Sequence, residues 1–72
     1  MEVNGREVQI LRTHYCRDYG TFSLVYDEEN RSYLYIHEKK GIRLGLEWAG
    51  LDEANALDGF ADYSKERSVG AY

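Results

Sequence analysis

The chain has no proline, a single cysteine and no apolar run of membrane-spanning length. Cys16 has no second thiol to pair with, so an internal disulfide is excluded, and a small chain without one is typical of a reducing compartment. The start MEVNGREV has neither the basic segment nor the apolar stretch of a signal peptide. We therefore expect a cytoplasmic protein with no membrane segment.

Basic residues are also few, at nine against thirteen acidic residues, and the formal net charge is −4. A protein built to coat phosphate backbones carries a basic excess, so this balance disfavours nucleic acid as a partner. Much of the acidity lies from Leu51 onward, where five acids outnumber two bases and leave a net of −3: Asp52, Glu53, Asp58, Asp62 and Glu66 against Lys65 and Arg67.

The length and the lack of linker-like stretches indicate one small domain. Seventy-two residues can bury only a limited core, and without proline or a low-complexity tract the chain shows no internal boundary. We predict a single domain over residues 1–72, in which residues 68–72 form a loose tail.

The stretch from Tyr33 to Trp48 alternates apolar and polar side chains as a β-hairpin with one buried side does. A three-residue loop ending at Gly41 would pair Glu38 with Ile42. That pairing gathers one set of apolar side chains on one face: Leu34, Ile36, Leu44, Leu46 and Trp48. The turn and the pattern support each other.

The stretch from Thr21 to Asp27 alternates in the same way and predicts a third strand. A three-residue loop over 28–30, with Asn30 in the left-handed conformation, would pair Asp27 with Arg31. This register adds Phe22 and Leu24 to the apolar face of the hairpin.

A further strand is predicted from Glu7 to Cys16, where adjacent Ile10 and Leu11 suggest a bulge. Its facing depends on the next loop. Four loop residues over 17–20 put Leu11, Thr13 and Tyr15 on the face of Phe22, and three loop residues invert this. We favour four, because more apolar surface is then buried. The pair Asn4-Gly5 suits a tight turn that folds the N-terminus back.

A helix is predicted after Asp52, which is suited to be its N-cap. Gly59 inside this helix costs about 1 kcal/mol relative to alanine, which indicates a close approach to the sheet or a kink. Helical spacing forms one apolar stripe: Ala54, Leu57, Phe60, Ala61 and Ser64. We therefore predict an α+β fold, a three- to four-stranded antiparallel β-meander with one C-terminal α-helix packed on its apolar face.

The predicted partner-binding residues lie on two surfaces. Tyr33, Tyr35 and His37 would share the open face of the sheet, and exposed aromatic clusters are typical of protein interfaces; alternatively, the tyrosines only stabilise the sheet by cross-strand packing. Asp58 and Asp62 stand one helical turn apart, where like charges do nothing for the helix, so they would dock on a basic surface of a larger protein. A solvated acidic face is the simpler interpretation.

No catalytic, cofactor or metal motif is present, and we expect a protein that is not an enzyme. His14, Cys16 and His37 are too few and too unfavourably spaced for a zinc site or a Cys/His nucleophile. An alternative to protein binding is a single-stranded nucleic-acid module in which Tyr33 and Tyr35 stack bases beside basic residues such as Lys39.

The favoured hypothesis is a non-enzymatic interaction module that binds, and inhibits or regulates, a larger protein. In size, acidity and simple architecture the chain resembles the small inhibitors that phages and mobile elements encode against host defence, including anti-CRISPR and anti-restriction proteins. This is a resemblance of general character and rests on no motif. It implies an acidic helix that occupies a site meant for nucleic acid. An exposed aromatic face on so small a core also favours a homodimer.

Overall fold

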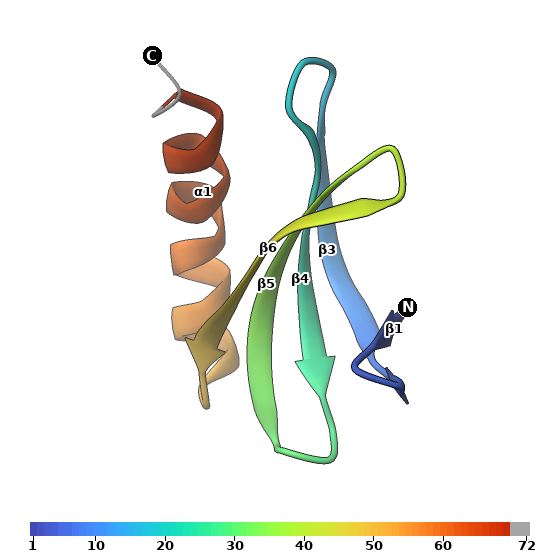
Figure 1. Cartoon of the computed structure of the whole chain (residues 1–72). Coiled ribbons are helices and arrows are strands. Elements are labelled where there is room, and N and C mark those ends of the chain that lie inside the picture. Colours follow the sequence, from blue (N-terminus) through green and yellow to red (C-terminus); the bar gives the residue numbers. More distant parts are fainter. Residues whose placement is uncertain (70–72) are drawn as a thin grey trace.

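The computed structural model describes residues 1–69 and shows an α+β fold in which a four-stranded antiparallel sheet lies between a helix and a small hairpin (Figure 1). The sheet order is β3-β4-β5-β6, so β3 and β6 are its edges. The predicted meander with one C-terminal helix is confirmed. The elements are β1 (Glu2–Val3), β2 (Arg6–Glu7), β3 (Gln9–Cys16), β4 (Gly20–Asp27), β5 (Ser32–Lys39), β6 (Ile42–Gly50) and α1 (Glu53–Val69).

The predicted N-terminal turn is confirmed as the hairpin β1–β2. Asn4 and Gly5 both take positive φ, at 54° and 80°, and Val3 pairs with Arg6. This hairpin lies on the sheet face opposite α1, where Val3 and neighbouring Val8 form a core cluster with two sheet residues, Val25 and Ile36. The sheet is therefore covered on both sides, although the hairpin covers only part of its face.

The predicted facing is correct for β4 and wrong for β5 and β6. Phe22, Leu24 and Tyr35 lie beneath the helix, while Ile36 is buried under the N-terminal hairpin. The remaining apolar residues predicted to face the helix are partly or largely open: Leu34 is half-buried, and Leu44, Leu46 and Trp48 are 52%, 42% and 63% exposed.

A one-residue difference in the β4–β5 loop explains the inversion. The loop has four residues, 28–31, because Asp27 pairs with Ser32, and the positive φ of 51° falls at Arg31 instead of Asn30. The Asp27 carboxylate shapes this loop by accepting hydrogen bonds from the backbone N–H groups of Glu29 and Asn30, at 3.1 and 3.4 Å. A slip of one residue moves every side chain of a strand to the other face.

The β3–β4 loop also differs from the favoured prediction. Cys16 pairs with Gly20, so the loop has three residues and the inverted alternative is correct for Thr13 and Tyr15, whereas Leu11, at the bulge, packs on the helix-side cluster as favoured. His14 consequently lies opposite Phe22, on the face of the helix. The predicted bulge is confirmed, since the register shifts between Ile10 and Arg12.

The β5–β6 turn has two residues, Lys40 and Gly41, with φ of 52° and 78°. Lys39 therefore pairs with Ile42, and the predicted pairing of Glu38 with Ile42 is wrong. A register shift follows near Leu44, after which the apolar residues of β5 and β6 still meet in pairs, Ile36 with Leu46 and Leu34 with Trp48. These apolar residues share one face of the sheet, as predicted, but it is the face opposite the helix.

Helix α1 begins as predicted. The Asp52 carboxylate accepts a hydrogen bond from the backbone N–H of Asn55 at 3.1 Å, as an N-cap does. The helix continues to Val69, so residues 68 and 69 are helical where a tail was predicted, and the rest of that tail, 70–72, lies outside the described residues. Within residues 1–69, no helix combines the length and apolar character needed to span a membrane.

The buried side of α1 is rotated from the predicted stripe. Its buried residues are Ala56, Phe60, Tyr63 and Ser64, whereas Leu57 is half-buried and Ala54 and Ala61 are exposed. The predicted close approach at Gly59 is confirmed, because a Cβ there would fall inside the contact distance of the Tyr35 hydroxyl.

Candidate functional site

The residues predicted to form a tyrosine surface are instead part of the core. Tyr35 and His37 are 8% and 7% exposed, and Tyr33 is half-buried. The Tyr35 hydroxyl donates to the Ala56 carbonyl oxygen at 2.7 Å, and burial raises the pKa of this phenol. These three side chains therefore do not form the exposed surface that was expected to bind a partner.

His37 belongs to the same core, at the end of the sheet near the β3–β4 loop. Its Nε2 lies 2.6 Å from the Tyr19 carbonyl oxygen, so this nitrogen carries the proton and donates it. Its ring stacks on Phe22, with centroids 4.3 Å apart and an interplanar angle of 10°. These contacts hold the ring within the fold and do not present it to a ligand.

The acidic residues of the helix lie at the surface as expected. Asp58 and Asp62 are exposed, one turn apart, on the side of α1 away from the buried Phe60 and Tyr63. In the described part of the chain, no cation lies within ion-pair distance of either carboxylate. Both charges remain available to a basic partner.

A row of exposed apolar side chains lies on the opposite side of the sheet. We call Leu44, Leu46, Trp48 and Leu51 the β6 surface; all four are exposed, and Leu51, which follows β6, is 69% exposed. Strand β6 hydrogen-bonds to β5 alone in the order of the described sheet, so its other edge offers unpaired backbone groups. The sequence pattern named three of these residues but assigned them to the core.

A pocket of about 290 Å³ adjoins the β6 surface. Its apolar wall is formed by Leu34 and three residues of the β6 surface, and its polar wall comes from the N-terminal hairpin and the β4–β5 loop: Asn4, Arg6, Asp27, Asn30 and Ser32. The pocket can therefore hold an apolar side chain against one wall and a hydrogen-bonding group against the other.

An ion pair fixes the polar wall of this pocket. The Arg6 Nη2 donates to Asp27 Oδ2 at 2.6 Å, and Arg6 Nε lies 3.0 Å from a carboxylate oxygen of Glu29. The hydrogen bond from Arg6 lowers the pKa of Asp27, and the same contact raises the pKa of Arg6. The pair ties the hairpin β1–β2 to the β4–β5 loop.

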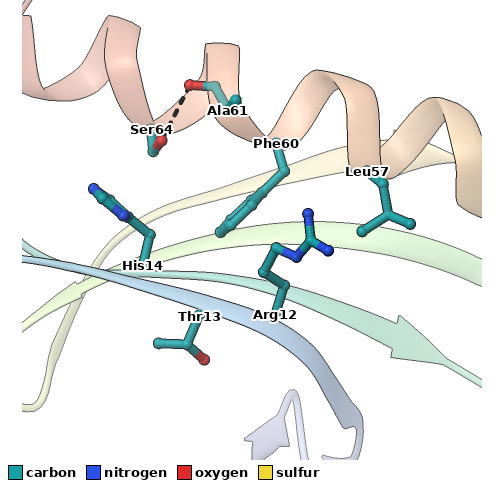
Figure 2. Close-up of a pocket in the computed structure, with 7 residues that line it drawn as sticks. All are labelled: Arg12, Thr13, His14, Leu57, Phe60, Ala61 and Ser64. Carbon is teal, nitrogen blue, oxygen red and sulfur yellow. Dashed lines mark hydrogen bonds between the residues drawn. The ribbon is translucent and has the colours of Figure 1, made fainter.

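A second pocket, of about 280 Å³, opens between β3 and α1 (Figure 2). The helix packs mainly over β4, β5 and β6, which leaves a gap on its β3 side. Figure 2 shows Phe60 reaching from the helix toward β3 between Arg12 and His14, whereas Thr13 points to the other side of the strand. This pocket was not predicted from the sequence, because the favoured β3–β4 loop placed His14 on the other face of the sheet.

No metal centre is found among residues 1–69, where no three His, Cys, Asp or Glu side chains gather in a metal-binding arrangement. His14 and His37 share a face but lie on either side of Phe22. Cys16 is a half-buried free thiol.

Comparison with known proteins yields no match to any family model, to any curated protein or to any solved structure.

Proposed function

We propose that this protein is a non-enzymatic interaction module of the cytoplasm that binds, and inhibits or regulates, a larger protein through its β6 surface. The observation that carries the proposal is the row of exposed apolar side chains at a free sheet edge, with Trp48 at 63% exposure. Apolar surface of this kind is costly to leave in water, and tryptophan is enriched among residues that dominate binding energy.

The chemistry of the edge indicates the form of contact. A partner strand added to β6 would satisfy backbone groups that the sheet leaves unpaired, while alternate side chains of that strand would meet Leu46 and Trp48. The adjoining pocket, with Leu34 on its apolar wall, would take one apolar side chain of the partner. A second copy of this chain has the same features, and a homodimer is the symmetric version of this contact.

The acidic helix gives a second contact of different chemistry. Asp58 and Asp62 lie on the far side of the sheet from the β6 surface and would dock on a basic site, such as one that holds nucleic acid. The general resemblance to small phage-encoded inhibitors of CRISPR and restriction systems agrees with this mechanism. The alternative function, single-stranded nucleic-acid binding by exposed tyrosines, has lost its support because Tyr35 is buried beneath the helix.

The proposal is tested by photo-crosslinking from position 46 in cells of the source organism, followed by affinity measurement with the purified partner. Trp48→Ala is expected to weaken binding at least tenfold, as loss of a hot-spot residue does. Tyr15→Ala is the matched control, because Tyr15 is similarly exposed, at 69% against 63% for Trp48, but lies on the other edge strand. Equal effects of the two variants would reject the β6 surface.

The same assay separates the two contacts. Charge reversal at Asp58 and Asp62 should weaken binding far more than alanine at Glu2 and Glu7 if the acidic helix takes part. Strong effects of charge reversal combined with no effect of Trp48→Ala would assign the contact to the helix alone. For the homodimer, sedimentation over a concentration series should show a mass increase that Leu46→Lys removes.

A further inference from the structure

We propose that the pocket between β3 and α1 binds a small organic carboxylate, in which one negative charge is attached to an apolar ring or short chain. The pocket's volume of about 280 Å³ lies just below the range of about 300–1,000 Å³ that is typical of small-molecule sites. It can accept a single ring and is too small to enclose a nucleotide. This inference does not depend on the function proposed for the β6 surface.

The charged side of the pocket comes from β3. Arg12 and His14 occupy alternate positions of the strand, and both side chains reach into the space beneath the helix (Figure 2). Among the residues that the structure describes, no carboxylate lies within ion-pair distance of Arg12, whereas Arg6 is paired with Asp27 at 2.6 Å. An unpaired guanidinium presents a planar fork of N–H donors that matches the two oxygens of a carboxylate.

The apolar side of the pocket comes from the helix. Leu57, Phe60 and Ala61 belong to the apolar stripe that helical spacing predicted, yet Leu57 is only half-buried and Ala61 is exposed. The stripe is left partly open because α1 packs mainly over the other three strands of the sheet. A ligand with an apolar body would remove this surface from water.

The remaining groups favour a singly charged ligand. Arg12 is the one permanent cation among the lining residues, and no acidic side chain lines the pocket. His14 can donate an N–H in either protonation state. The Ser64 hydroxyl already donates to the Ala61 carbonyl oxygen at 3.1 Å, so Arg12 and His14 are the donors left for an anion. A multiply charged phosphate would also meet the repulsion of a chain with net charge −4.

The test is a chemical-shift titration of the full ¹⁵N-labelled chain with phenylacetate and with its neutral analogue phenylacetamide. Phenylacetate should shift the amide signals of β3 and of the middle of α1, and should bind about tenfold more tightly than the amide, as one charge-assisted hydrogen bond implies. The preference should disappear in Arg12→Gln. It should persist in Arg17→Gln, where an exposed arginine of the β3–β4 loop outside the pocket is changed.

Two further arms complete the experiment. Ala61→Leu should fill the apolar side of the pocket and abolish binding of both compounds. A well-dispersed spectrum of each variant is the control that it is folded. A dipeptide ending in phenylalanine, with a free or an amidated C-terminus, distinguishes a protein's chain end from a free acid as the source of the carboxylate. Tighter binding by the free-terminus peptide or by phenylacetate would support the site in either case. The absence of localised shifts, equal affinity for the neutral compounds, or equal loss in Arg12→Gln and Arg17→Gln would overturn it.

Discussion

Single contacts between the sheet and the helix decide how closely the two layers approach. The Tyr35 hydroxyl reaches across to the Ala56 carbonyl oxygen, and Gly59, one turn further along, leaves the space that this hydroxyl occupies. A glycine that looks unfavourable by helix propensity is thus required by a tyrosine on the sheet. The sequence signalled the close approach, but it could not identify the residue that approaches.

Gly59→Ala should destabilise the protein, although alanine is the better helix former by about 1 kcal/mol. The new Cβ would overlap the Tyr35 hydroxyl, and overpacking of this kind costs about 1–3 kcal/mol. Denaturant unfolding measures the change. In a Tyr35→Phe background the same substitution should cost less, because the overlapping oxygen is gone; an identical cost in both backgrounds would show that Tyr35 is not the cause.

The buried carboxylate of Asp27 makes stability depend on pH. Its pKa is lowered, first by the hydrogen bond from Arg6, so the unfolded chain binds the proton more readily than the folded one. The stabilisation is present above the unfolded pKa of about 3.9 and is lost as the pH falls through the folded value. The free energy of unfolding should therefore decrease below about pH 4. Asp27→Asn should flatten this decrease and exposed Glu28→Gln should not, as measured by denaturant titrations across the acid range.

At the scale of elements, the loops decide which side of each strand faces the helix. Local patterns identified these elements: alternation predicted the strands and the meander, the Asn4-Gly5 pair predicted the N-terminal turn, and Asp52 predicted the helix start. The loop over 28–31 is one residue longer than its composition suggested and the loop after Cys16 one residue shorter than favoured, and both changes invert facing. The prediction failed at β5 because one face of this strand carries Leu34 and Ile36 and the other carries Tyr33 and Tyr35, so burial alone could not choose between registers.

The same inversion explains which functional residues could be predicted. Asp58 and Asp62 were correctly expected at the surface, since their exposure follows from helical spacing alone. The exposure of Trp48 and the approach of Arg12 to the helix depend on loop register and could not be read from the strand pattern.

The N-terminal hairpin is a packing element of the second core cluster. Val3 is fully buried there beside Ile36. Val3→Ala removes two methyl groups from this cluster and should lower the free energy of unfolding by about 1.5 kcal/mol. Ile10→Ala removes more atoms from a side chain that is 47% exposed and should cost less. A larger effect at Ile10 than at Val3, in denaturant unfolding, would contradict the packing of the hairpin on the sheet.

At the scale of the whole molecule, the two sides of the sheet differ in character. The helix side buries an aromatic core and carries an acidic outer face, whereas the opposite side is covered only where the hairpin reaches it. The uncovered part includes the β6 surface and, on the other edge strand, Tyr15. Apolar exposure at a free sheet edge is an aggregation hazard, and a partner that covers this edge, as proposed above, would remove the hazard.

Leu46→Lys should leave the free energy of unfolding within about 0.5 kcal/mol of the original, because the side chain is already partly solvated. It should also lower the tendency to self-associate, which light scattering at rising concentration measures. A strong loss of stability in this variant would place Leu46 in the core and contradict the facing of the sheet.

The most direct test of that facing is the fluorescence of Trp48, the single tryptophan of the chain. At concentrations where the protein is monomeric, the native emission maximum should lie close to that of the chain unfolded in guanidinium, and acrylamide should quench both states with similar efficiency. A native emission shifted strongly to shorter wavelength and protected from acrylamide would show Trp48 buried, and the open β6 surface would not exist.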